Sequence, residues 1–140
     1  MTRLGLQRWI FLIVVAILGT GTVHGQDPAD KAARTSVDAW LSLIDGHSYA
    51  ASWDAAASVF KNAVTQDQWS AAVEKVRTPL GKVKSRALTS TTPTSPPGAP
   101  PGEYLVFQFD TSYEQRSTAE IVTVFKEKDG SWRAAGYFIK

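Results

Sequence analysis

The chain has 140 residues, no cysteine, two histidines and a formal net charge of +2 at pH 7. This length corresponds to one domain, and the absence of cysteine excludes disulfides and thiolate metal ligands. His24 lies in a segment that we expect to be removed, and His47 alone cannot complete a zinc site of the usual nitrogen and sulfur type, so we expect no metal. The sequence has no dinucleotide-binding fingerprint, and we expect no cofactor.

The first 25 residues have the pattern of a secretory signal peptide. Arg3 and Arg8 give a positive start, residues 9–18 are apolar, and residues 23–25 offer small side chains at the spacing of a cleavage site. The apolar run is shorter than the roughly 20 residues that span a bilayer, so we expect cleavage before Gln26; an uncleaved anchor is the alternative. The protein is then exported, periplasmic or secreted, and meets a membrane only through this segment.

Cleavage would leave a mature domain, residues 26–140, without net charge. It removes Arg3 and Arg8, two of the 15 basic residues, so that 13 remain to balance the 13 acidic residues. Nucleic-acid binding needs a basic surface, so we expect no nucleic-acid partner. Glycine-rich phosphate loops are also missing from the sequence.

Three helices are predicted in the first half of the mature chain. Asp27 and Pro28 are typical of a helix start, and Gly46 is expected to end that helix. A second helix is expected from Ser48 to about residue 60. The third begins at the capping box of residues 65–68 and ends before Pro79, because proline disfavours helical geometry at Thr78.

Aromatic and apolar side chains fall at helical spacing along these segments. We expect the stripe to form core rather than a ligand pocket; it consists of Trp40, Tyr49, Trp53, Phe60 and Trp69. Val73 and Val76 are expected on the buried face of the third helix with Trp69. Arg77 is expected to complement the C-terminus of that helix, with anion binding as the alternative, and Asp54 is expected to be exposed.

Four strands are predicted after the helices. The first, residues 82–91, is rich in serine and threonine, and residues 103–113 alternate between apolar and polar with a period of two. Residues 118–127 are rich in β-branched side chains, and residues 132–139 return to pair with them. The Pro-rich connection, residues 93–102, contains five prolines and is expected to be an exposed link outside the sheet.

The strand register is expected to follow from the turns. A two-residue type I′ turn at Asp129-Gly130 would pair Val122 with Tyr137, Glu120 with Ile139, Val124 with Ala135 and Phe125 with Ala134. A two-residue turn at Glu114-Gln115 would place Phe107 beside Val122 and Phe109 beside Glu120. One sheet face is then apolar, with the Glu120 carboxylate set into it.

Helices that cover one face of an antiparallel sheet make an α+β domain. We predict three N-terminal helices packed on a curved four-stranded antiparallel sheet. By analogy, such a sheet forms a cone with a pocket, as in nuclear-transport-factor-two-like and cystatin-like folds.

Several short motifs occur together in the mature chain: Asp38-Ala39-Trp40-Leu41, residues 49–54, Arg77-Thr78-Pro79-Leu80-Gly81, Gly102-Glu103-Tyr104, residues 129–133 and Gly136-Tyr137-Phe138. In this combination and order the chain resembles the bacterial "domain of unknown function 4019" family, from about Ala32 to Ile139. The resemblance implies an exported bacterial single-domain protein and assigns no catalytic residue. The Pro-rich connection is longer and denser in proline than the family pattern.

Glu120 is the residue on which a site is expected to centre. A carboxylate on an apolar sheet face must reach water, pair with a cation or keep its proton. Arg86 is the expected cation, and Tyr137 is expected to be diagonally adjacent. Glu120, Tyr137 and Arg86 are therefore the predicted ligand-binding groups; a salt-bridged or solvated Glu120 at the sheet rim is the alternative.

Three functions are compatible with the sequence. The preferred one is a non-catalytic envelope domain that binds a partner or a small apolar ligand. The second is a cone-fold enzyme in which Glu120 and Tyr137 transfer a proton inside an apolar cup. The third is a structural subunit of a larger envelope assembly.

Overall fold

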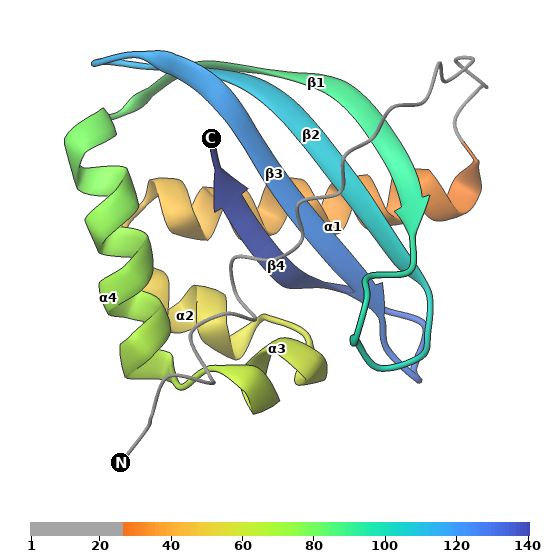
Figure 1. Cartoon of the computed structure of the whole chain (residues 1–140). Coiled ribbons are helices and arrows are strands. Elements are labelled where there is room, and N and C mark those ends of the chain that lie inside the picture. The colour runs from red at the N-terminus through yellow and green to blue at the C-terminus, as the bar shows by residue number, and fades with distance from the viewer. Residues whose placement is uncertain (1–26) are drawn as a thin grey trace.

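The structure is a computed structural model that describes residues 27–140, and it has the expected α+β architecture with a four-stranded antiparallel sheet. The sheet order is β1-β2-β3-β4, and Figure 1 shows the sheet curving over α1. The elements are α1 (Pro28–Asp45), α2 (Tyr49–Asp54), α3 (Ser58–Ala63), α4 (Gln66–Arg77), the 3-10 turn η1 (Thr78–Leu80), β1 (Val83–Thr94), β2 (Tyr104–Tyr113), β3 (Ser117–Lys126) and β4 (Trp132–Ile139). The predicted signal segment, residues 1–25, and the cleavage before Gln26 lie outside the described residues. Within residues 27–140, no helix is both long and apolar enough to cross a bilayer.

Side-chain caps fix the starts of the two longest helices. Oδ1 of Asp27 accepts from the backbone N–H of Ala29 at 3.1 Å, and Pro28 is the first residue of α1. At α4, the backbone of Gln68 donates to Oγ1 of Thr65 at 3.2 Å, and the backbone of Thr65 donates to Oε1 of Gln68 at 3.1 Å. Both predicted starts are confirmed, because each cap satisfies N–H groups that have no partner inside the helix.

Helix α1 ends at Asp45 with Gly46 as its C-cap, as expected, but the residue in the left-handed conformation is His47. His47 takes the left-handed conformation, with φ of 60°, whereas Gly46 has φ of −84°. The backbone N–H of Ser48 donates to the carbonyl of Leu43 at 2.8 Å, and that of His47 donates to Ile44 at 3.1 Å. These two bonds form a Schellman motif, so a histidine occupies the position where glycine is usual.

The predicted second helix is two short helices, α2 and α3. The chain leaves helical geometry at Ala57, whose backbone N–H donates to the carbonyl of Ala134 on β4 at 2.7 Å. Glu127 then holds the start of α3, because its Oε1 accepts from the backbone of Ser58 at 2.6 Å. Ser48 makes no side-chain cap at α2. The expected continuous helix was wrong because tertiary hydrogen bonds to the sheet replace helical ones.

The buried face of α4 is formed by Trp69, Val73 and Arg77, at steps of four residues. Val76, expected on this face, is exposed. Thr78 keeps helical angles, contrary to the prediction, and Pro79 lies inside the 3-10 turn η1. The proline therefore changes the helix type after Arg77 and does not push Thr78 out of the helical region.

The central register of the sheet is the predicted one. Phe107 pairs with Val122, Phe109 with Glu120, Val122 with Tyr137, and Glu120 with Ile139. An irregularity between Thr123 and Val124 shifts the pairing nearer the turn by one residue. Val124 pairs with Ala134 and not with Ala135, and Phe125 pairs with Arg133 and not with Ala134. The core-facing alanine of β4 is therefore Ala134, and Ala135 is only half-buried.

The β3–β4 turn is not the predicted type I′ turn. That turn needs positive φ at both central residues, but Gly130 has φ of 85° and Asp129 is not among the positive-φ residues. Gly130 donates its N–H to the carbonyl of Glu127 at 2.9 Å, and Glu127 donates to Ser131 at 2.8 Å. A longer connection with one left-handed glycine matches these bonds and changes the register by one residue.

Strand β1 continues into the Pro-rich connection. Pro93 pairs with Leu105 and Thr94 with Tyr104, so the first two residues of the stretch 93–102 belong to the sheet, contrary to the expectation. Strand β1 lies at the edge of the sheet. Proline has no backbone N–H to donate to a neighbouring strand, and it is tolerated at such an edge. The remaining residues form the loop to β2, where Oη of Tyr104 donates to the carbonyl of Pro100 at 2.8 Å.

Aromatic side chains fill the space between α1, α4 and the inner sheet face. The rings of Trp40 and Trp69 have centroids 5.8 Å apart, and the Tyr137 ring lies 5.5 Å from Trp40 and 6.1 Å from Trp69. Ser52 accepts from both indoles, through its carbonyl from Trp40 and through Oγ from Trp69, at 2.9 Å each. The polar edges of both tryptophans are thus satisfied inside the core.

Candidate functional site

Glu120 lies fully buried on the inner face of β3, with 0% of its side chain exposed. Alternation along the strand directs it to the same face as Val122 and Val124. Its neighbours in the ladder are Phe109 and Ile139, as the register predicted. A carboxylate in this position is costly unless every oxygen finds a donor.

Four hydrogen bonds satisfy the Glu120 carboxylate. Oε1 accepts from Nε of Arg86 at 2.6 Å and from Oγ1 of Thr111 at 3.0 Å. Oε2 accepts from Oη of Tyr113 at 2.9 Å and from Oη of Tyr137 in a shorter bond. A carboxylate has about four acceptor positions, so this one has none left for a further donor.

A second arginine approaches the same carboxylate from α4. Arg77 donates through Nη1 to Oη of Tyr137 at 3.3 Å, and that nitrogen lies 3.8 Å from Oε2 of Glu120. The guanidinium carbon lies 5.1 Å from the centroid of the Tyr113 ring, in a cation–π contact. Nε of Arg77 is buried and has no hydrogen-bond partner within residues 27–140.

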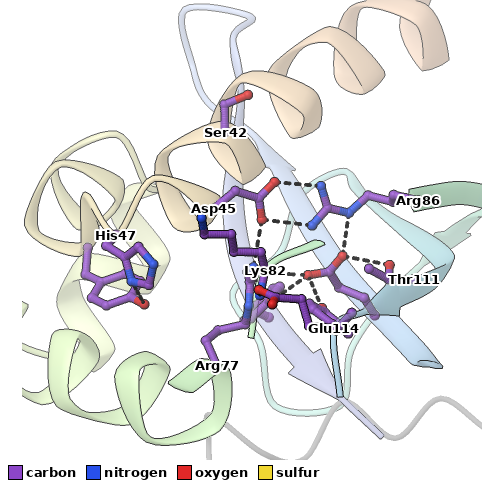
Figure 2. Close-up of polar contacts among 12 residues, drawn as sticks. Ser42, Asp45, His47, Arg77, Lys82, Arg86, Thr111 and Glu114 are labelled. Atoms are coloured by element: carbon purple, nitrogen blue, oxygen red, sulfur yellow. Dashed lines mark hydrogen bonds and ion pairs between the residues drawn. The ribbon is translucent and has the colours of Figure 1, made fainter. Parts of the chain in front are cut away.

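Asp45, the last residue of α1, joins the two arginines. Arg86 binds it with two parallel bonds, Nη1 to Oδ2 at 2.9 Å and Nη2 to Oδ1 at 3.0 Å, and Nη2 of Arg77 donates to Oδ1 at 2.9 Å. Figure 2 shows Asp45 facing Arg86 and Arg77 from the end of its helix. The exposed side-chain fractions rise from 0% at Glu120 and 5% at Arg77 to 16% at Arg86 and 30% at Asp45. Asp45 is thus the member of this charge network that reaches solvent most.

Burial and charge act together on the titrating groups. Burial raises the pKa of the Tyr137 and Tyr113 hydroxyls, and the negative charge of Glu120 raises both pKa values further. Burial alone would raise the pKa of Asp45, but hydrogen bonds from Arg86 and Arg77 outweigh it and hold the pKa below its ordinary value. For Arg86, bonds to Asp45 and Glu120 outweigh burial and raise the pKa. Both tyrosines therefore stay neutral donors at pH 7, and Asp45 and both arginines stay charged.

The structure brings together all three residues predicted from the sequence, Glu120, Tyr137 and Arg86. It adds four that were not predicted as site residues, namely Asp45, Arg77, Thr111 and Tyr113. Sequence signals for three of them existed. Thr111 and Tyr113 continue the alternation of Phe107 and Phe109, and Arg77 follows Trp69 and Val73 at helical spacing.

The other candidates have ordinary positions. Trp40, Phe60 and Trp69 are buried in the core, Tyr49 and Trp53 are partly buried against it, and Asp54 is exposed, as expected. His47 contacts the hydroxyl of Tyr49 through Nδ1 at 2.9 Å. Among residues 27–140, no group of three or more histidine, aspartate or glutamate side chains could hold a metal ion.

Comparison with known proteins identifies a family. No curated protein matches the chain. A family model described as "Protein of unknown function (DUF4019)" matches residues 36–137, which include every residue of the charge network. Because this match covers well over half of the sequence, the chain belongs to the DUF4019 family.

Proposed function

We propose that this protein is an exported, non-catalytic binding domain of the cell envelope. The observation that carries the non-catalytic part of the proposal is the saturation of Glu120 by Arg86, Thr111, Tyr113 and Tyr137. Export is inferred from the signal-peptide pattern of residues 1–25. A general base needs a free acceptor within hydrogen-bond reach of the substrate proton. The enzyme alternative, proton transfer by Glu120 and Tyr137, would first require one of these buried bonds to break.

Binding is proposed at the end of the network that solvent reaches, beside Asp45 and Arg86. Their exposed side-chain fractions of 30% and 16% contrast with the buried inner members. The inner sheet face is occupied by Trp40, Trp69 and Tyr137, so an apolar ligand would meet side chains already packed there. Polar recognition at the rim therefore fits the structure better than an apolar cup.

Export and binding can be tested on one sample. The full chain is expressed in a bacterial host, the envelope fraction is released gently, and its mass is measured under native and denaturing conditions. We expect a mature chain that begins at Gln26, and under native conditions an additional mass from a bound molecule or partner. The control is the same protein unfolded and refolded in clean buffer, which should lack that mass.

Two results would contradict the proposal. An intact segment of residues 1–25 on the envelope protein would show that it is retained as an anchor. Equal native masses for the released and refolded samples would remove the binding claim and favour a structural subunit. These results are independent, because cleavage and ligand retention concern different parts of the chain.

A further inference from the structure

The two arginines present one continuous set of donors to a single carboxylate. Arg86 binds Asp45 through both terminal nitrogens, at 2.9 and 3.0 Å, and Arg77 adds a third bond at 2.9 Å. A guanidinium is planar, and its paired N–H groups match the two oxygens of a carboxylate. The donors around Asp45 therefore have the arrangement of a carboxylate-binding site. The carboxylate bound there is the side chain of Asp45 itself, at the end of α1.

Groups other than Asp45 hold both arginines in place. Nε of Arg86 donates to Glu120 at 2.6 Å, and Nη1 of Arg77 donates to Tyr137 at 3.3 Å. The Arg77 guanidinium also lies over the Tyr113 ring at 5.1 Å. If Asp45 moved away, both guanidinium groups would still be anchored. Such pre-organisation reduces the ordering cost that an incoming ligand meets.

Asp45 is the member of the network that is easiest to replace. It is the last residue of α1, where the negative end of the helix dipole disfavours a carboxylate. The motif that ends this helix contains His47 in the left-handed conformation that non-glycine residues adopt rarely. Asp45 is also 30% exposed, whereas Glu120 is fully buried. Its two bonds to Arg86, which is 16% exposed, therefore lie nearer to solvent than its bond to Arg77, which is 5% exposed.

Charge balance limits what could replace it. Asp45 and Glu120 neutralise Arg77 and Arg86, so departure of Asp45 leaves one uncompensated positive charge. A monocarboxylate restores both neutrality and the planar paired bonds. A phosphate dianion would add an extra negative charge beside buried Glu120, where the low dielectric makes repulsion strong.

We propose that the position occupied by the Asp45 carboxylate is a binding site for small organic carboxylic acids, which exchange with Asp45 on Arg86 and Arg77. This inference rests on the proposed binding function and specifies its ligand class. In the ligand-free protein, Asp45 closes the site. Displacement of Asp45 frees the last turn of α1, so occupancy is expected to alter the segment 45–48.

The test uses acetate as the probe and the arginine Nε–H resonances of the ¹⁵N-labelled protein as the readout. Sodium chloride at equal ionic strength is the control for screening, and inorganic phosphate is the control for anion class. In the wild-type protein, we expect acetate to shift the Arg86 and Arg77 signals saturably. In Asp45→Ala, the same shifts should need at least about tenfold less acetate, because the internal competitor is gone. Acetate should also raise the thermal midpoint of Asp45→Ala, as binding to the folded state requires.

Each outcome decides the proposal. Wild-type arginine signals that do not shift with acetate would overturn the proposal, even if Asp45→Ala responds. Acetate would then not displace Asp45 from the two arginines. Equal responses to acetate and chloride, or a stronger response to phosphate, would also overturn it. If Asp45→Ala does not fold, the wild-type titration decides alone. Bound mass on the envelope protein combined with a failed acetate titration would keep the binding function and reject this ligand class.

Discussion

Arg86 and Glu120 form a 2.6 Å bond between two strands that are not neighbours in the sheet. Arg86 belongs to edge strand β1 and Glu120 to β3, so the bond passes over β2 beside Thr111, which pairs with Arg86 in the ladder. The curvature of the sheet visible in Figure 1 is consistent with such a contact. The pair therefore links the edge strand to the core through side chains.

Glu120→Gln should destabilise the fold strongly. The substitution keeps the volume but removes one charge of a buried network, and breaking a buried ion pair from one side costs about 3–5 kcal/mol. Amide nitrogen would also face donors where an oxygen now accepts from Tyr113 and Tyr137. Chemical denaturation of a purified chain of residues 26–140 measures the change.

The matched control is the exposed pair of Arg34 and Asp38, which is also an arginine–carboxylate contact, at 2.8 Å. Asp38→Asn should change stability by no more than about 1 kcal/mol, because exposed ion pairs are screened by water. Equal effects of the two substitutions would mean that the Glu120 carboxylate is hydrated in solution.

Stability should fall at both ends of the pH scale for separate reasons. The pKa of Asp45 is held below its ordinary value of 3.8 by Arg86 and Arg77 in spite of burial. The contribution of Asp45 to the free energy of unfolding is therefore complete above pH 3.8 and is lost as the pH falls through the folded pKa.

Burial and the Glu120 charge raise the pKa of Tyr113 and Tyr137 above 10.0. The contribution of the two tyrosines to the free energy of unfolding is therefore complete below pH 10 and is lost as the pH rises further.

Tyr113→Phe and Tyr137→Phe separate the alkaline contribution from other groups. Above pH 10 each buried tyrosine should steepen the loss of stability by about 1.4 kcal/mol per pH unit, since only the unfolded chain releases its proton. Each variant should therefore show a shallower alkaline slope than the wild-type protein. Slopes that stay the same would mean that these hydroxyls titrate normally in the folded state.

Trp69→Ala should cost roughly 3–5 kcal/mol, the usual range for removing a buried aromatic side chain. Trp69 is 2% exposed, its indole donates to Ser52, and it packs against Trp40 and Phe60. Val76→Ala on the same helix is the control and should cost under about 0.5 kcal/mol, because Val76 is exposed. A loss below about 1 kcal/mol for Trp69→Ala would place Trp69 outside the packed core.

Gly130→Val should destabilise by about 1 kcal/mol or more, because β-branched residues resist the left-handed conformation. Gly130 has φ of 85°, and a Cβ there would meet no atom within 4 Å, so the expected cost is conformational and not steric. Gly130→Asn is the control, since asparagine tolerates this conformation, and it should retain most of the stability. Equal thermal midpoints for the valine variant and the wild-type protein would contradict the turn geometry.

The sequence predicted the fold class and most of the sheet because local signals agreed with tertiary packing. The capping box at Thr65, the alternation through Phe107 and Phe109, and the central pairing of Glu120 are encoded by neighbouring residues. The split of the second helix was not predictable in this way, because it depends on Ala57 bonding to Ala134, far away in the chain. The one-residue shift in the pairing of Val124 was not predictable either, because it follows from a bulge in the ladder and a turn longer than two residues.

The site was predicted in part for a similar reason. Glu120 was detectable as a carboxylate on an apolar face, and that position required a cation. Arg77 was assigned to its own helix terminus because a single sequence does not show that α1 brings Asp45 within 2.9 Å of it. Asp45 gave only a weak signal, a carboxylate at an unfavourable helix end.

The hydroxyl protons of Tyr113 and Tyr137 report whether the hydrogen-bond network around Glu120 is closed to water. Proton NMR in water should show both hydroxyls as separate, slowly exchanging signals, each removed by the corresponding phenylalanine variant, because both are buried and donate to Glu120. Tyr104, whose hydroxyl donates to Pro100 in a partly buried bond, provides the faster-exchanging comparison. Hydroxyl protons of Tyr113 and Tyr137 that exchange with water as fast as that of Tyr104 would show that the network is open to water, and Glu120 and Tyr137 would again be candidates for a proton-transfer pair.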